Sequence, residues 1–133
     1  MRRILLDTTF LVDSMRDPAR VDDLILDTDD VAMAAVTVAE LLVGVVLGPD
    51  SEREARRAAI EEAMSAIPVV NYDLVAASHH AELMAATRRF GRPRGGHDLI
   101  IAATARASGR TVLSSDGAAF GGLPGVASVI YSR

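Results

Sequence analysis

Cysteine, lysine and tryptophan are absent from the chain, which has only two tyrosines and three phenylalanines. The lack of cysteine excludes disulfides, thiolate metal sites and cysteine nucleophiles. The scarcity of aromatic rings argues against a base-stacking sheet of the RRM or OB type. No apolar run approaches the roughly 18–20 residues of a membrane span, and the N-terminus does not read as a signal peptide. We therefore expect a cytoplasmic protein with no membrane segment.

Charge is distributed unevenly along the 133 residues, whose net charge is −4. Residues 1–82 carry −9 and residues 83–133 carry +5. All 14 basic residues are arginine, which suits bidentate phosphate contacts but can also reflect genome composition. A basic surface beside an acidic pocket would suit a polyanionic substrate. The length favours one domain spanning residues 1–133.

Short apolar runs alternate with helical patterns along the whole chain. Strands are expected at 3–6, 31–34, 69–71, 111–114 and 126–130, and helices at 8–16, 18–27, 37–47, 51–67, 73–90 and 97–108. Thr37 is expected to cap one helix and Ser51 to open another with a capping box. This alternation predicts an α/β fold, in which helices cover both faces of a mostly parallel sheet.

Four acids differ from the others in their surroundings: Asp7 ends an apolar run, Glu40 lies in TVAELLVG, Asp98 in GHDLIIAA and Asp116 in TVLSSDGAAF. Burying a carboxylate among such residues is costly unless its charge is compensated. Asp7 and Asp116 follow predicted strands, and Glu40 and Asp98 lie near helix starts. All four can therefore meet at the carboxyl edge of the sheet, where sites of α/β folds lie.

Each of these acids also has a purely structural interpretation. Asp7 and Asp98 suit helix N-caps, Glu40 a solvent-facing helix position, and Asp116 a turn residue in an Asp-Gly pair. These interpretations stay open for each acid alone. A structural origin for all four would require four independent coincidences at one edge of the sheet.

Three or four carboxylates at one edge suit phosphodiester hydrolysis with one or two divalent ions. Mg²⁺ and Mn²⁺ favour oxygen ligands of this kind. Such an ion lowers the pKa of a bound water and neutralises charge that develops on the phosphate. One of the carboxylates can instead orient or deprotonate the water.

Other candidate sites are weaker. His79 and His80 are adjacent on a predicted helix and point apart, so they do not suit one metal ion. His97 precedes Asp98 and suits either a local structural role or a phosphate contact. No GxGxxG or Walker motif occurs, so a nucleotide cofactor has no support.

The motifs DTTFLVD, TVAELLVG, GHDLIIAATA and LSSDGAAFGGLPGV resemble, in order and spacing, those of PIN-domain ribonucleases. They look most like the VapC toxins of prokaryotic toxin–antitoxin pairs. The resemblance covers nearly the whole chain and implies one PIN domain, a three-layer α/β/α sandwich around a mostly parallel sheet of four to five strands. It also implies an Mg²⁺- or Mn²⁺-dependent endoribonuclease.

Carried over residue by residue, the acidic quartet of the family falls on Asp7, Glu40, Asp98 and Asp116. Thr8 matches the hydroxyl residue after the first acid, and Ser114 the Ser/Thr two residues before the fourth. A further acid found in similar proteins is replaced here by Ala119. RNA contacts are predicted for Arg88, Arg89, Arg92 and Arg94, which alternatively only solubilise a helix end and loop.

The resemblance further implies a homodimer and a VapB-type antitoxin, with the helices from Ser51 and Asp73 as candidates for its groove. Haloacid-dehalogenase phosphatases and receiver domains also use an acid after the first strand, but they need a further acid and a lysine that this chain lacks. The remaining alternative is a catalytically inactive PIN-like module that binds RNA or protein. The intact quartet speaks against it, because an inactive site would be free to lose its mutually repelling acids.

Overall fold

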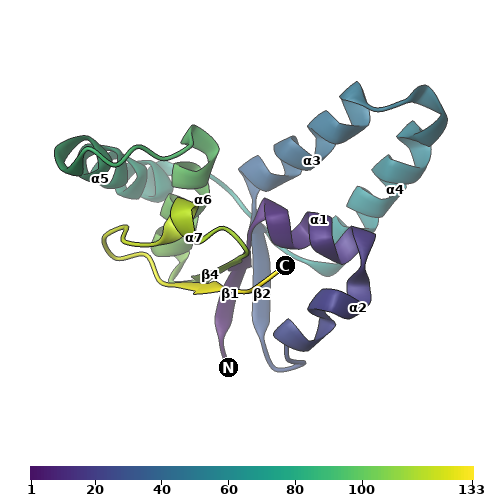
Figure 1. The fold of residues 1–133 in the computed structure, drawn as a ribbon, viewed down its shortest axis with the longest axis horizontal. Coiled ribbons are helices and arrows are strands. Elements are labelled where there is room, and N and C mark those ends of the chain that lie inside the picture. The colour runs from purple at the N-terminus through teal and green to yellow at the C-terminus, as the bar shows by residue number, and fades with distance from the viewer.

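A five-stranded sheet forms the centre of the protein, whose 133 residues are all described by a computed structural model (Figure 1). The strands are β1 (Arg3–Leu6), β2 (Asp30–Ala34), β3 (Val69–Val70), β4 (Thr111–Ser114) and β5 (Ser128–Ile130). They lie in the order β3-β2-β1-β4-β5, and every neighbouring pair is parallel. The predicted mostly parallel sheet is confirmed, and it is in fact entirely parallel.

Helices cover both faces of this sheet. They are α1 (Thr8–Arg16), α2 (Pro18–Val21), the 3₁₀ helix η1 (Asp22–Leu24), α3 (Ala35–Leu47), α4 (Asp50–Ala66), α5 (Leu74–Phe90), α6 (Gly96–Ser108) and α7 (Gly117–Phe120). Figure 1 shows α5, α6 and α7 on one side of the strands and α1 to α4 on the other. None of the helices is long and apolar enough to cross a membrane.

Alternation along the strands separates two hydrophobic cores. Leu5 and Val112 pack with α5, α6 and α7, whereas Ile4, Leu6 and Leu113 pack with α1 to α4. Successive side chains of a strand point to opposite faces, so each buried strand supplies both cores. This division confirms the predicted three-layer α/β/α arrangement.

Residues 18–27 do not form the single helix that was predicted. Only one turn of α2 forms, followed by one turn of 3₁₀ helix at Asp22–Leu24. Asp29 accepts a hydrogen bond from the Leu26 N–H at 2.8 Å and pairs with Arg2. These bonds hold the chain in a turn before β2, and aspartates compete with helical hydrogen bonding.

Two predicted helix starts are also wrong. α3 begins at Ala35, directly after β2, and Thr37 is a fully buried residue inside it rather than its cap. α4 begins at Asp50, one residue after Pro49, and no side chain caps it, so the capping box expected at Ser51 is absent. In both cases the preceding strand or proline determines where the helix begins.

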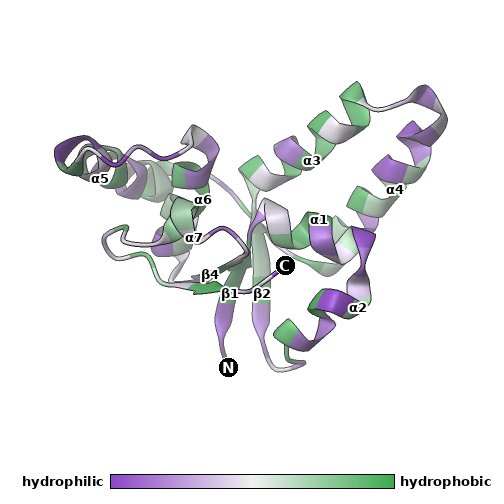
Figure 2. Cartoon of the chain, viewed as in Figure 1, coloured by the Kyte–Doolittle hydropathy of each residue, from purple (hydrophilic) through white to green (hydrophobic).

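Helices α3 and α4 form an arm that projects from the body of the molecule (Figure 2). Figure 2 shows hydrophobic residues along α3 even where it leaves the body. Val43, Val46 and Leu47 are exposed there, while Leu41 and Val45 are buried. The arm and the lobe of α5 and α6 stand on either side of the carboxyl edge of the sheet.

Candidate active site

Asp7 lies immediately after β1 and is only 3% exposed, although it carries a carboxylate. Its Oδ1 accepts hydrogen bonds from the Phe10 N–H at 2.9 Å and the Thr9 hydroxyl at 2.8 Å, and its Oδ2 accepts one from Ser114. The Phe10 bond makes Asp7 the N-cap of α1, so its structural interpretation is correct. Burial raises the pKa of Asp7 above its usual value, and the three donors oppose that rise.

Glu40 lies in the second turn of α3, which follows β2 directly, and faces the same edge of the sheet. Its Oε1 accepts a hydrogen bond from the Thr8 hydroxyl at 2.8 Å, and its Oε2 lies 3.7 Å from Nδ1 of His97. Thr8 also contacts the Thr37 hydroxyl at 3.3 Å. Glu40 is therefore held by α1, not left pointing to solvent, and Thr8 supports Glu40 rather than Asp7.

Asp98 lies in the first turn of α6, whose N-cap is Gly95, so Asp98 is not the cap of this helix. Burial raises the pKa of Asp98, and the negative charges of Asp116, Glu40 and Asp7 raise it further. His97 opposes the rise weakly. An effect of all three other acids on one carboxyl group means that the four share one region of the molecule.

Asp116 lies two residues after β4 and caps α7, where its Oδ1 accepts a hydrogen bond from the Ala119 N–H at 3.1 Å. The sequence predicted only a turn at this point. Ser114 connects this acid to Asp7, because its hydroxyl donates to Asp7 and accepts from the Asp116 N–H at 2.9 Å. Ser114 is fully buried, so this connection is part of the core.

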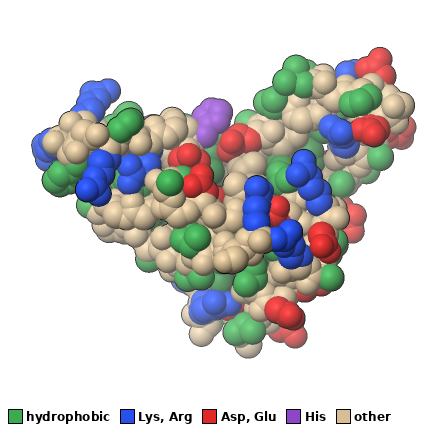
Figure 3. Space-filling model, viewed as in Figure 1, with side chains coloured by type: hydrophobic (Ala, Val, Ile, Leu, Met, Phe, Trp, Pro, Cys, Tyr) green, Lys and Arg blue, Asp and Glu red, His purple; other side chains and the backbone are tan.

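Figure 3 shows that acidic side chains and a histidine gather where the surface is hollowed between the α3–α4 arm and the lobe of α5 and α6. The donors are carboxylate oxygens, which suit a hard divalent cation, and their mutual repulsion is what such an ion would relieve. No three Asp, Glu or His side chains lie close enough together to hold one ion between them in this arrangement. The residues thus fit such an ion in chemistry and charge, but their spacing is wider than that of a formed site.

The four predicted RNA-contacting arginines lie at the C-terminal end of α5 and in the loop that leads to α6. Arg88 and Arg89 are exposed in the last turn of α5, where their positive charge interacts favourably with the helix dipole. Arg92 is exposed in the following loop. Arg94 is partly buried and donates at 2.8 Å to the Gly121 carbonyl, so much of its guanidinium serves the loop itself.

Thr9 is the residue of this site that the sequence did not indicate. Its hydroxyl donates to both oxygens of Asp7 and lies 3.2 Å from the hydroxyl of Ser115, more than a hundred residues away in the chain. Only the parallel pairing of β1 with β4 brings these residues together. Nothing in the motif DTTFLVD distinguishes the role of Thr9 from that of Thr8.

Comparison with known proteins supports what the geometry suggests. The family model described as the PIN domain matches residues 4–121. The chain belongs to the PIN-domain family. In this PIN domain, the four acids lie where the ends of β1 and β4 meet helices α3 and α6.

Relatives of this PIN domain include the tRNA(fMet)-specific endonuclease VapC of Shigella flexneri, which is 32% identical over 118 residues, 87% of this chain and 88% of that protein. A crystal structure of VapBC-5 from Mycobacterium tuberculosis is 28% identical, with a TM-score of 0.80 over 98% of this chain and 100% of the other. DNA-bound VapBC from Salmonella typhimurium is 25% identical, with a TM-score of 0.86 over 97% and 98%. The PIN domain described here is thus an endonuclease of the VapC type, in a family whose nucleases are metal-dependent in general.

Proposed function

We propose that residues 1–133 act as one PIN domain that cleaves RNA with Mg²⁺ or Mn²⁺ held by Asp7, Glu40, Asp98 and Asp116. The arrangement of the acids supports this most directly, because Ser114 bonds both Asp7 and Asp116, and the charges of Asp116, Glu40 and Asp7 all act on Asp98. None of these mutually repelling acids forms an ion pair with an arginine, so a cation that they share would explain them. Asp7 and Asp98 are the firmest ligands in this proposal, Glu40 supports them, and Asp116 is the fourth.

The side chains of the protein prepare this site in different ways. Three donors fix the carboxylate of Asp7, and Thr8 fixes one oxygen of Glu40 at 2.8 Å. Ser114 couples the positions of Asp7 and Asp116. A divalent ion held by these carboxylates would lower the pKa of a bound water and would neutralise charge on the phosphate. Because these carboxylate oxygens are already held in place, the site needs less rearrangement of its polar groups when cleavage occurs.

The experiment that tests this function is incubation of the purified protein with RNA in Mg²⁺, in Mn²⁺ and in a chelator. Transfer RNA is the first substrate to test, because relatives from Shigella and Salmonella are named tRNA(fMet)-specific endonucleases. Sequencing of 5′ ends should reveal a few metal-dependent cuts that the Asp98→Asn variant does not make. Equal cleavage by that variant would refute the site, and absence of both cleavage and metal binding would favour an inactive binding module.

We also propose that the protein is the toxin of a type II toxin–antitoxin pair, forms a homodimer and acts in the cytoplasm, where its RNA lies. Relatives of known structure are toxin–antitoxin complexes, which supports a VapB-type antitoxin as partner. A hollow of about 520 Å³ between α3 and α4, lined by Met15, Leu41, Val45 and Ile60 among others, suits an apolar segment of such a partner. This assigns the antitoxin to α4, one of the two helices suggested by the sequence.

Ala55→Arg tests the antitoxin assignment, because Ala55 is exposed on α4 and lines this hollow. Ala58→Arg is the matched control, being exposed on the same helix but outside the lining. Co-purification with a VapB-type antitoxin produced in the same cells should fail for Ala55→Arg and persist for Ala58→Arg. Undiminished co-purification of both variants would remove the antitoxin from this hollow.

A further inference from the structure

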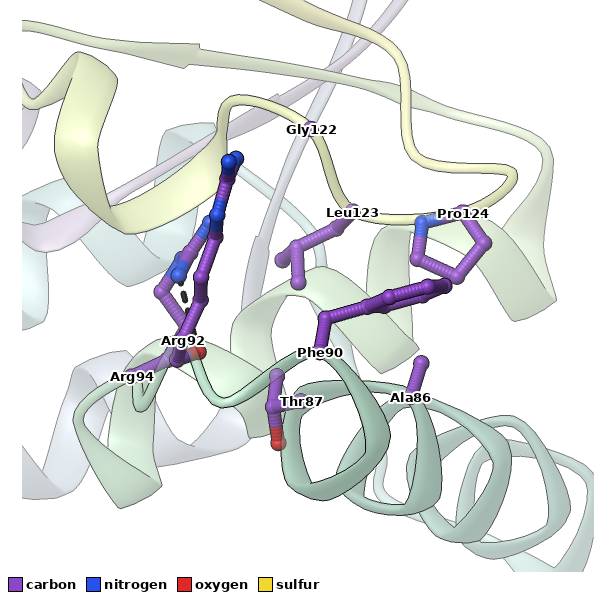
Figure 4. Close-up of a pocket in the computed structure, with 8 residues that line it drawn as sticks. All are labelled: Ala86, Thr87, Phe90, Arg92, Arg94, Gly122, Leu123 and Pro124. Carbon is purple, nitrogen blue, oxygen red and sulfur yellow. Dashed lines mark hydrogen bonds between the residues drawn. The ribbon is translucent and has the colours of Figure 1, made fainter.

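A second cavity, of about 330 Å³, lies on the other lobe, between the end of α5 and the loop after α7 (Figure 4). Phe90, Arg92, Arg94, Leu123 and Pro124 are among the residues that line it. Figure 4 shows Phe90 projecting from α5 toward Leu123 and Pro124, while the two arginine side chains extend together toward the loop at Gly122. One part of the cavity is thus aromatic and apolar and another is cationic.

The exposure of Phe90 has no structural explanation within the fold. The side chains of the other two phenylalanines, Phe10 and Phe120, are only 4% and 1% exposed, whereas Phe90 is 72% exposed. Exposing an aromatic ring forgoes the stabilisation that its burial would provide. Phe90 ends α5 directly before Gly91, whose φ of 62° turns the chain away and leaves the ring at the cavity.

The arginines that line this cavity, Arg92 and Arg94, and their neighbours Arg88 and Arg89 carry charge that no acid neutralises. None of Arg88, Arg89, Arg92 and Arg94 takes part in the ion pairs of the protein. Arg94 is fixed by hydrogen bonds to the carbonyls of Arg92 at 3.0 Å and Gly121 at 2.8 Å, and its buried Nε has no partner. The loop after α5 is therefore held against the loop after α7 with its positive charge uncompensated.

The same two loops lead directly to the acids of the active site. The loop that contains Arg94 continues into Gly95, the N-cap of α6, and Asp98 follows in the first turn. The other loop follows α7, which Asp116 caps. Figure 3 shows arginine side chains on this lobe beside the hollow where acidic side chains gather. A chain of phosphates crossing the acids would continue over this cavity.

We propose that this cavity binds a nucleobase of the RNA close to the cleaved bond, stacked on Phe90, with Arg92 facing an adjoining phosphate and Arg94 holding the loop that carries Arg92. This assignment rests on the proposed ribonuclease function. A base has apolar faces that suit an aromatic ring, and its phosphates suit unpaired guanidinium groups. The cavity selects an unpaired nucleotide, because a base inside a duplex cannot stack on a side chain.

RNA is favoured over a protein ligand by charge and by position. A peptide in this cavity would need acidic groups to match the uncompensated arginines, and it would lie beside carboxylates that repel those groups. The phosphates of RNA meet arginine here and would meet the proposed metal at the acids. Binding of the antitoxin at this cavity is accordingly an outcome that the experiment must detect.

The test compares Phe90→Ala with Leu74→Ala, which removes another exposed hydrophobic side chain, 89% exposed, from the opposite end of α5. Both changes are made in the inactive Asp98→Asn protein. The probe is a single-stranded RNA of about 12 nucleotides carrying 2-aminopurine, whose fluorescence is quenched by stacking. Phe90→Ala should weaken binding on the order of tenfold and reduce the quenching, whereas Leu74→Ala and Phe90→Trp should retain both.

Cleavage by the otherwise native protein separates this inference from the function on which it rests. Phe90→Ala should raise KM more than it lowers kcat and leave the melting temperature unchanged, because the ring is exposed. If the native protein cleaves RNA and Phe90→Ala has the same kcat/KM and RNA affinity, the base site is wrong while the ribonuclease stands. If Phe90→Ala weakens only antitoxin binding, the cavity is a protein site and the inference is overturned.

Discussion

At the scale of single residues, the four acids differ in how firmly the protein holds them. Asp7 accepts hydrogen bonds from three donors and caps α1, whereas the raised pKa of Asp98 reflects burial and neighbouring charges without any donor. A carboxylate fixed by the core contributes to stability as well as to chemistry. A carboxylate opposed only by its neighbours destabilises the metal-free protein.

Asp98→Asn should therefore abolish activity while stabilising the metal-free fold. We expect RNA cleavage to fall at least about 100-fold, because even partners of metal ligands contribute 10- to 100-fold. The melting temperature without metal should rise, since one of four mutually repelling charges is removed. Asp7→Ala is the contrast: it also loses activity, but it should lower the melting temperature because the cap and the partners of buried donors are lost. An Asp98→Asn protein that melts below the parent without metal would contradict this.

Tyr131 forms a part-buried polar contact, in which its hydroxyl donates to Asp13 at 2.7 Å. This bond lowers the pKa of Asp13, and burial followed by the bond raises the pKa of Tyr131 to about 12. Tyr131→Phe keeps the edge-to-face contact with Phe10 but should cost about 1–2 kcal/mol at pH 7. Tyr72→Phe, at an exposed tyrosine, is the control.

The pH dependence of that cost has a definite sign. Because the pKa of Asp13 is lowered in the folded protein, this carboxylate stabilises the fold at pH values above about 3.9, the pKa of an aspartate in the unfolded chain. That contribution is lost as the pH falls through the folded pKa of Asp13. The raised pKa of Tyr131 means that unfolded protein ionises first, so the parent loses stability as pH rises from about 10 toward about 12. Urea unfolding should show the gap between parent and Tyr131→Phe narrowing at both extremes. A gap that stays constant with pH would argue against this pair as its source.

At the scale of elements, the position of Asp98 depends on the two glycines at the start of α6, Gly95 and Gly96. Gly95 caps α6 with ordinary backbone angles, but a Cβ placed on it would lie 2.9 Å from Oδ2 of Asp98. The added Cβ would therefore displace the carboxylate of Asp98 but would not displace any backbone atom. A Cβ on Gly96 would meet nothing within 4 Å.

Gly95→Ala should therefore reduce cleavage by roughly 10- to 100-fold, as displacements of about 1 Å in an active site do, with little change in melting temperature. Gly96→Ala is the control, and it should leave cleavage close to that of the parent. Initial rates of RNA cleavage at saturating metal measure both effects. Equal rates for the two variants would mean that the present position of the Asp98 carboxylate does not matter for activity.

The elements also show which features a sequence can indicate. The strands were predictable because their apolar runs are short and bounded by turn residues, and the N-cap of α5 at Asp73 follows from a local preference. The start of α3 was not predictable, because it depends on where β2 ends its pairing with β1 and β3. The short helix α7 was missed because the Asp116-Gly117 pair is also a strong turn signal.

The same distinction holds inside the site. The four acids were identifiable because a charge in apolar surroundings is locally conspicuous. The parts played by Thr9 and by the contact of His97 with Glu40 were not, because both depend on residues distant in the chain. Local chemistry thus indicated the charged groups, and the fold determines which neutral groups support them.

At the scale of the whole molecule, the two halves of the chain differ in charge, with −9 in residues 1–82 and +5 in residues 83–133. The arginines at the end of α5 and in the loop after it concentrate part of the positive charge on the lobe of α5 and α6. Binding of single-stranded RNA through Z phosphate contacts gives log K a slope of about −0.7Z against log salt concentration. Arg94 is held by backbone carbonyls, so Arg88, Arg89 and Arg92 are the freest to make such contacts.

Three contacts predict a slope of about −2 for RNA binding by the inactive Asp98→Asn protein. Changing any one of Arg88, Arg89 and Arg92 to Gln should make the slope shallower by about 0.7, because one fewer counterion is released.

Arg53→Gln is the control, since Arg53 pairs with Asp50 on the arm, away from this lobe. Fluorescence anisotropy between 50 and 300 mM NaCl measures each slope, with these limits chosen to span roughly the range over which such contacts lose affinity. A slope that changes as much for Arg53→Gln as for the three others would mean that RNA is attracted by the overall charge of the protein. A selective change would instead assign the phosphates to the end of α5, which is the path that leads from the base site to the acids.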